Sequence, residues 1–305
     1  MSGNIKNSNL GGVSIAFQKI AVGVAFSPTA EAMLMETARL AQILSAEMLL
    51  IHAGNQTTDT EARMNEMIAK CDINGSLRSR LTIIWGKGDP VDVILDSCRK
   101  HYVDLLVTGA LKKENLVEYY VGTIARKVLR KAGCSVLTIV NPSTESKSYK
   151  NVVVSAEDST YIEEALSTAC SLVPRDNGSW LHIVREVKMY GLTMAASDQH
   201  TEEEYENVRQ GLVKQEIEKV EEILKDIPHE GFRINIKMVS GKSGFELPKF
   251  AQRKNADLLV VGAPPRRFSF FDRLFPHDLE YIFADLPCNL LVVRQSKYRK
   301  EESRG

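Results

Sequence analysis

DLLVTGA at residues 104–110 returns as DLLVVGA at residues 257–263, with six of seven positions identical at an offset of 153 residues. A second pair, CSVLTIV at residues 134–140 and CNLLVVR at residues 288–294, shares its pattern at an offset of 154. Two blocks that recur in the same order and at nearly the same spacing indicate an internal repeat. The chain therefore carries two copies of one structural unit.

Each copy alternates short apolar runs with amphipathic segments. In the first copy the runs lie near residues 19–24, 47–53, 80–85, 104–108 and 135–140, and helical periodicity occupies residues 29–44, 59–70, 89–101 and 121–132. Continuous Val, Ile and Leu runs are typical of parallel strands covered on both faces by helices. The pattern predicts an α/β fold of two tandem flavodoxin/Rossmann-like, doubly wound, five-stranded parallel sheets. Each sheet is expected in strand order 3-2-1-4-5.

The repeat and the polar stretches divide the chain. We predict a flexible N-terminal segment (1–16), a first domain (17–141), a linker (142–149), a second domain (150–295) and a charged tail (296–305). In the second copy about 48 residues separate the second and third strands, against about 26 in the first. This extra length includes a charged helix over residues 202–226 with an apolar stripe at Val208, Leu212, Ile217, Val220 and Leu224. Simple elaboration is the favoured interpretation, and a flap or docking surface is the alternative.

Composition excludes several classes of protein. Lys+Arg and Asp+Glu both number 39 in 305 residues, so no global basic field favours a nucleic-acid partner. No apolar run reaches the roughly 18 residues of a membrane span, and the polar start lacks the apolar core of a secretory signal, so we expect a cytoplasmic protein. The five cysteines are scattered with no CxxC pair, which disfavours disulfides and Cys-based zinc sites.

A candidate anion site follows the fourth strand of the first copy. Gly109 ends the strand, Lys112 lies shortly after it, and Gly122-Thr123 opens the next helix. Glycine allows close approach of a ligand to the backbone, and free amides at a helix N-terminus favour phosphate. A threonine hydroxyl and a lysine would add donors, so the pattern predicts a phosphate cradle.

The same residues resemble a known family. A strand followed by Gly109, a spacer and Gly122-Thr123, together with YVGTIARKV at residues 120–128 and AGCSVL at residues 132–137, is similar to the ATP-binding signature of universal stress proteins. The resemblance spans roughly residues 17–140 and 150–294. It implies a site for ATP or another adenine nucleotide, with or without Mg²⁺, made by Gly109, Lys112, Gly122, Thr123, Ile124 and Ala53. It also implies that the fifth strands of the two copies pair, giving an intramolecular pseudo-dimer that could itself form a homodimer.

Both copies depart from the family pattern. In the first, Lys112 replaces the second glycine of the motif, and Ala25 stands where nucleotide-binding members carry an acidic residue. In the second, Glu157 and Gly262 are kept, but PHD at residues 276–278 replaces the Gly-Ser/Thr helix start. Proline removes a backbone donor there, and aspartate adds negative charge. We therefore predict a degenerate second site, made by Glu157, Gly262, Arg266 and Arg267.

Two functions remain open from the sequence. The first is a stress-response regulator that binds an adenine nucleotide in the first copy. The second is a nucleotide-independent adaptor that holds a regulated protein through the long helix and an Arg/Phe-rich loop of the second copy. We find no catalytic set and no metal-ligand spacing, so we expect no enzyme, although slow ATP hydrolysis stays open. His52 and His182, which we place at equivalent ends of the second strand of each copy, are assigned structural roles.

Overall fold

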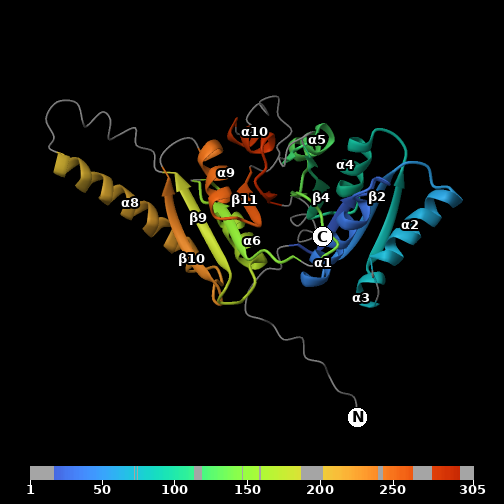
Figure 1. The fold of residues 1–305 in the computed structure, drawn as a ribbon, viewed down its shortest axis with the longest axis horizontal. Coiled ribbons are helices and arrows are strands. Elements are labelled where there is room, and N and C mark those ends of the chain that lie inside the picture. Colours follow the sequence, from blue (N-terminus) through green and yellow to red (C-terminus); the bar gives the residue numbers. More distant parts are fainter. Residues whose placement is uncertain are drawn as a thin grey trace, which may run out of the picture.

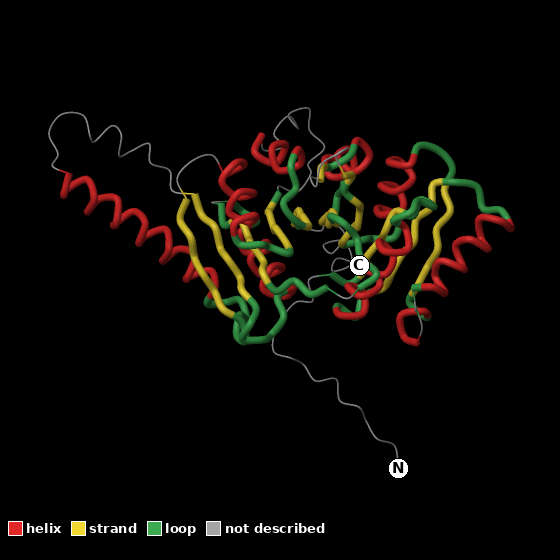
Figure 2. The backbone as a smooth tube through the Cα atoms, in the orientation of Figure 1, coloured by secondary structure: helices red, strands yellow, loops and turns green. Residues whose placement is uncertain are grey.

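The computed structural model describes residues 17–295, except residues 72, 74, 113–118, 146, 158, 187–201, 240–242 and 264–276. Its strands form one mixed ten-stranded sheet in the order β10-β9-β8-β11-β12-β7-β4-β1-β2-β3, flanked by helices (Figures 1 and 2). Each half of this order is a parallel sheet in the sequence 3-2-1-4-5. The predicted fold class and strand order are therefore confirmed, with the two sheets joined into one.

The first half, up to residue 141, follows the predicted alternation to within about two residues. Its elements are β1 (Lys19–Gly23), α1 (Ala30–Ile43), β2 (Glu47–Ala53), α2 (Thr58–Lys70), α3 (Gly75–Arg78), β3 (Leu81–Gly86), α4 (Pro90–Lys100), β4 (Leu105–Gly109), β5 (Leu111–Lys112), β6 (Tyr119–Tyr120), α5 (Thr123–Lys131) and β7 (Ser135–Ile139). The short helix α3 and the two-residue strands β5 and β6 were not predicted.

The second half, from residue 150, repeats this plan. Its described elements are β8 (Asn151–Ser155), α6 (Ile162–Leu172), β9 (Trp180–Glu186), α8 (Glu202–Leu224), β10 (Arg233–Val239), α9 (Ser243–Arg253), β11 (Leu258–Gly262), α10 (His277–Ala284) and β12 (Asn289–Val293). The predicted long helix is α8. Its N-terminal part projects beyond the edge strand β10, while its C-terminal end lies against the sheet (Figure 1).

The structure explains why the repeated motif begins with an aspartate in both halves. Asp104 precedes β4, and its carboxylate accepts hydrogen bonds from the backbone N–H groups of Gln18 (2.7 Å) and Lys19 (3.0 Å) at the start of β1. Asp257 precedes β11 and accepts from the N–H of Asn151 (2.8 Å) at the start of β8. A charge-assisted bond of this kind fixes the register of the two central strands of each half.

The helices cover both faces of the sheet. One apolar core lies under α1, α2, α3, α6 and α8, and a second lies under α4, α5, α9 and α10. Since the central strands are buried on both faces, their side chains are apolar in an uninterrupted run rather than in alternation. Asp89 caps α4 through bonds to the N–H of Val91 (2.9 Å) and Asp92 (3.3 Å), and Pro90 takes the first position of the helix.

The two halves meet at their fifth strands. β7 and β12 pair antiparallel, with Leu137 opposite Leu291, so the predicted pseudo-dimer contact is present. Pairing covers two strand edges that would otherwise invite association with other chains. Side chains reinforce the pairing symmetrically, because Ser135 Oγ binds the backbone of Arg294 and Asn289 Oδ1 accepts from the N–H of Val140 (2.8 Å).

The polar stretch between the halves is held against α1. The Arg39 guanidinium donates to the carbonyls of Ser143 (3.4 Å), Thr144 and Glu145 (2.6 Å), and the Glu36 carboxylate accepts from the N–H of Ser143 (2.6 Å). Burial raises the pKa of Glu36, although the bond from Ser143 opposes that effect. In the part of the chain that the structure describes, no helix is long and apolar enough to cross a membrane.

Candidate functional site

A pocket of about 530 Å³ opens at the carboxyl edge of the first half. It lies where β1, β2 and β4 end and where α4 and α5 begin, which is the edge at which ligands bind in open parallel sheets. Its volume falls within the range of small-molecule sites. It is lined by Gly23, Val24, Ala25, Ile51, His52, Ala53, Pro90, Ile94, Val107, Thr108, Gly109, Leu111, Gly122, Thr123, Ile124, Ala125 and Val128.

The start of α5 forms the polar end of this pocket. Gly122 is the N-cap residue and provides no side-chain cap, so the first amides of α5 receive no capping bond from it. Thr123 and Ile124 are exposed at this end and line the pocket. Because the first four amides of a helix have no partner within it and carry its positive dipole end, they can bind an anion.

Steric contact with a neighbouring side chain also explains why position 122 is a glycine. A Cβ atom at this position would lie 2.6 Å from Leu111 Cδ1 and 3.0 Å from its Cγ. Leu111 is itself 51% exposed and stands at the mouth of the pocket. Glycine therefore lets the side chain of Leu111 approach the backbone of the α5 N-terminus closely, without closing the pocket.

The rest of the pocket is apolar. Ala53, the position expected near the adenine, lines it at the end of β2, and exposed Ala25 lines it after β1. Thr108, Thr123 and His52 supply the polar side chains. None of the described lining residues carries a formal charge, with histidine counted as neutral. A bound phosphate would therefore depend on backbone amides and threonine hydroxyls.

Lys112 does not join the other predicted residues. It lies in β5, exposed, where it pairs with Tyr119 of β6, and it is not part of the pocket lining. The structure thus brings together Gly109, Gly122, Thr123, Ile124 and Ala53, and leaves Lys112 outside. The sequence did not single out the apolar walls at Leu111, Pro90 and Ile94. Pro90 and Ile94 fall within the helix predicted over residues 89–101, which begins at the same edge of the sheet.

His52 is a structural neighbour of the pocket. Its Nδ1 lies 2.8 Å from the carbonyl oxygen of Val24, tying the end of β2 to the segment after β1. Its ring packs against Phe26 (centroids 4.8 Å apart) and Trp85 (5.1 Å). Ring packing and a backbone bond account for this histidine without a catalytic role.

The predicted equivalence of His52 and His182 is wrong. The β8–β9 register places His182 opposite Val153, in the middle of its strand, whereas His52 stands near the end of β2. Burial, and then the charge of Lys254, lowers the pKa of His182. The residue of β9 that corresponds to His52 is Arg185, which donates to the carbonyl of Ala156 (2.9 Å) as His52 binds that of Val24. Counting residues from the start of each predicted strand would have identified Arg185 as the equivalent of His52.

In the second half, a side chain occupies the position next to Gly262. A Cβ at Gly262 would lie 2.6 Å from Tyr161 Cδ2, whereas a Cβ at Gly109 would lie 3.5 Å from Met33 Sδ, an ordinary contact. Glu157 is exposed after β8. Burial, and then the charge of Glu157, raises the pKa of Tyr161. Of the other predicted residues, Arg266, Arg267 and Pro276 lie outside the described part, and so do the side chains of His277 and Asp278.

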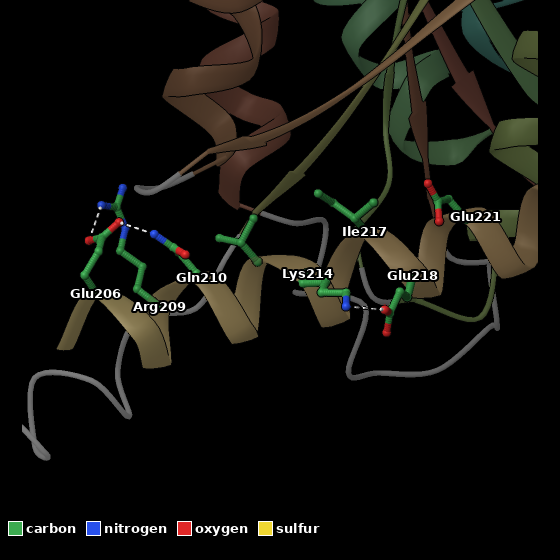
Figure 3. Close-up of a pocket in the computed structure, with 8 residues that line it drawn as sticks. Glu206, Arg209, Gln210, Lys214, Ile217, Glu218 and Glu221 are labelled. Carbon is green, nitrogen blue, oxygen red and sulfur yellow. Dashed lines mark hydrogen bonds and ion pairs between the residues drawn. The ribbon is translucent and has the colours of Figure 1, made fainter. Parts of the chain in front are cut away.

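α8 carries a second hollow, of about 520 Å³, along one face (Figure 3). Its described lining is Glu206, Arg209, Gln210, Val213, Lys214, Ile217, Glu218 and Glu221. Ion pairs cross this face, from Arg209 to Glu206 (3.3 Å) and from Lys214 to Glu218 (3.8 Å). Further along, Glu216 pairs with buried Arg185 and with Lys219 (2.6 Å), which anchors the helix to β9.

Metal-ligand chemistry finds no support among the described residues, where no three His, Cys, Asp or Glu side chains cluster as a metal site would need. The five cysteines are buried and unpaired by disulfides. Burial raises the pKa of Cys170 and Cys288 to about 12, so neither thiol is an ionised nucleophile at neutral pH.

Comparison with known proteins gives the same fold. The sequence model of the universal stress protein family matches residues 78–139 and 148–294. A functionally unknown protein from Pseudomonas aeruginosa PAO1 superposes with a TM-score of 0.66 at 15% identity, covering 95% of this chain and 97% of that one. A universal stress protein from Archaeoglobus fulgidus DSM 4304 gives 0.59 at 14% identity, covering 94% and 99%. No curated protein matches the chain with significance.

Proposed function

The chain belongs to the universal stress protein family, and from that premise we propose that its first half binds an adenine nucleotide as a regulatory ligand. The observation that carries this proposal is the coincidence of the uncapped α5 N-terminus with a pocket of about 530 Å³ at the carboxyl edge of the sheet. An apolar wall for a base and free amides for a phosphate are the two features that a nucleotide requires.

The lining also restricts the ligand. Because the described pocket residues carry no formal charge, the affinity for phosphate rests on the helix terminus, worth about half an elementary charge. A triphosphate gains little over a monophosphate under these conditions. We therefore expect AMP, ADP and ATP to bind with affinities within about tenfold of one another.

Regulation, rather than catalysis, fits the described residues. Among the described lining residues no nucleophile–base pair occurs, because the one titratable side chain in that set, His52, binds the carbonyl of Val24 and packs between aromatic rings. We propose that the second half holds no comparable nucleotide site, since Tyr161 packs against Gly262 at the corresponding edge. A cytoplasmic location remains a prediction of the sequence.

Thr123→Asp tests the proposal directly. An aspartate at the first residue of α5 favours the helix dipole by about 0.3–1 kcal/mol, so the free protein should be at least as stable as wild type. The same charge should repel a bound phosphate and weaken nucleotide binding about tenfold or more. Thermal shift and calorimetric titration with AMP and ATP measure the two effects separately.

Thr123→Ser, which keeps the hydroxyl, is the matched control and should bind as wild type does. Protein purified without added nucleotide should release adenine nucleotide on denaturation, or gain melting temperature when nucleotide is added. The proposal fails if wild type does neither. It also fails if Thr123→Asp binds as tightly as wild type.

A second candidate function is the binding of a protein partner, favoured by α8. The helix has eight glutamates against three basic residues, a net charge of −5, and it carries Val208, which is 49% exposed. The negative charge would repel a second copy of α8. We therefore expect the partner to present a basic amphipathic segment. Val208→Glu should abolish binding of a Lys/Leu amphipathic peptide, while Thr123→Asp should leave it unchanged.

A further inference from the structure

The segment that leads into helix α5 and the last turn of α5 are both hydrogen-bonded to the other half of the molecule. At the N-terminal end, the N–H of Val121 donates to the carbonyl of Phe283 (2.9 Å), and the N–H of Leu286 donates to the carbonyl of Tyr119 (3.0 Å). Tyr119 and Leu286 form an antiparallel bridge. The segment that leads into Gly122 is thus attached to the end of α10, and the two helices lie next to each other in Figure 1.

These contacts use groups that a helix leaves unpaired. The carbonyl of Phe283 belongs to the last turn of α10, where carbonyls have no partner within the helix. Phe283 and Val121 are both almost fully buried, at 0% and 1% exposure. Since water cannot replace the bonds at this depth, separating the two segments would leave buried polar groups unsatisfied.

At the C-terminal end of α5, the contact is a buried charge. Arg294 follows β12, is 4% exposed, and donates from Nη2 to the carbonyl of Leu129 (2.6 Å) in the last turn of α5. A cation at this position complements the negative end of the helix dipole. The backbone of Arg294 is fixed in turn, because Ser135 Oγ accepts from its N–H (3.0 Å) and lies 3.3 Å from its carbonyl oxygen.

This support is not symmetrical. The residue after β7 that corresponds to Arg294 is Val140, whose backbone N–H binds Asn289 but whose side chain has no donor. At this position, the first half therefore offers no cation to α10. The second half therefore supports α5, the helix that lines the pocket of the first half.

We infer that the second half positions the ligand-binding terminus of α5, with Arg294 as the positioning residue and the Phe283–Leu286 segment as the second point of attachment. Arg294 lies at the far end of α5 from the pocket and acts through the helix. By linkage, a ligand that binds better to the held α5 must stabilise these contacts by the same factor. Occupancy of the pocket is thereby transmitted to α10. The predicted effect on ligand affinity rests on the proposed function, whereas the role of Arg294 in holding α5 does not.

The test uses Arg294→Met and Arg294→Lys in the full chain. Methionine keeps the apolar stem and removes the charge and donor, whereas lysine keeps all three. We expect hydrogen exchange of the α5 amides at residues 126–129 to accelerate about tenfold in Arg294→Met and to be largely restored in Arg294→Lys. Arg209→Met, an exposed arginine on α8, is the matched control and should leave α5 unchanged.

The ligand arm measures AMP affinity in the same variants. Arg294→Met should weaken AMP binding about tenfold with exchange in β1 and β2 unchanged, and AMP should slow exchange at residues 282–286 of the wild type. Equal α5 exchange in wild type, Met and Lys variants overturns the inference, as does equal acceleration in Met and Lys, which would indicate packing alone. If wild type binds no AMP, the proposed function falls, and the α5 exchange result still decides the role of Arg294.

Discussion

The two halves share one fold and differ at the edge where a ligand would bind. In the first half a Cβ at Gly109 would meet the sulfur of Met33 only at an ordinary contact distance, and Gly109 lines a pocket of about 530 Å³. In the second half the ring of Tyr161 packs directly over Gly262. The same strand order therefore carries different side chains beside the equivalent glycine of each half.

The second difference lies at the end of the second strand of each half. His52 binds the carbonyl of Val24 and packs between aromatic rings, whereas Arg185 binds the carbonyl of Ala156 and also pairs with Glu216 of α8. In the first half the residue at this position ties the end of β2 to the segment after β1. In the second half it anchors the long helix α8.

The largest expected effect comes from Arg185→Met. Arg185 is almost fully buried, and its loss removes one of the two cations that pair with Glu216 among the described residues, together with the donor to the carbonyl of Ala156. We expect a loss of about 2–3 kcal/mol in the free energy of unfolding, measured by urea denaturation. The corresponding change in the first half, His52→Met, removes one hydrogen bond to a backbone carbonyl and should cost only about 1 kcal/mol.

The difference in the free energy of unfolding between wild type and Arg185→Met should depend on pH. Burial opposes ionisation of Glu216, but hydrogen bonds from Lys219 and Arg185 outweigh it and lower the pKa of the carboxyl from 4.5. A depressed pKa stabilises the folded protein above the unfolded value, and the gain disappears as pH falls through the folded one. The gap between wild type and Arg185→Met should therefore be full at pH 7 and shrink below about pH 4.5. A gap that is constant from pH 7 to pH 3 would contradict the ion pair as its source.

A smaller effect separates Gly262→Ala from Gly109→Ala. The added methyl group would meet Tyr161 at 2.6 Å in the second half but Met33 at 3.5 Å in the first. Overpacking against the ring should cost about 1–3 kcal/mol, whereas Gly109→Ala should change stability by less than about 0.5 kcal/mol. Differential scanning calorimetry of the two variants measures this. Equal losses would mean that Tyr161 moves aside easily and that the second edge is not firmly filled.

The sequence predicted the fold far better than the site. Repetition and apolar runs are local signals, so the residues predicted the alternation of strands and helices, while the pairing of residues 135–140 with 289–293 was implied by the family resemblance. Tyr161, by contrast, comes from a segment more than 100 residues from Gly262, and no periodicity reports that its ring lies over the glycine. Lys112 was assigned to the site because it lies close to Gly109 in the sequence and takes the place of a glycine in the family motif, whereas the structure places it in β5, outside the lining.

The smallest expected effect comes from Ala25→Asp, which gives the open half the carboxylate that the filled half keeps as Glu157. Ala25 is exposed at the pocket, so the change should alter stability by less than about 0.5 kcal/mol. A carboxylate that accepts from ribose hydroxyls should add about 1.5 kcal/mol to binding, hence about tenfold tighter AMP than deoxy-AMP, against a ratio near one in wild type. Calorimetric titration with both nucleotides measures the ratio, and Ala25→Asn, which accepts without charge, should fall between the two. An unchanged ratio in Ala25→Asp would place the sugar away from β1, and the pocket would then hold its ligand by the base and the α5 terminus alone.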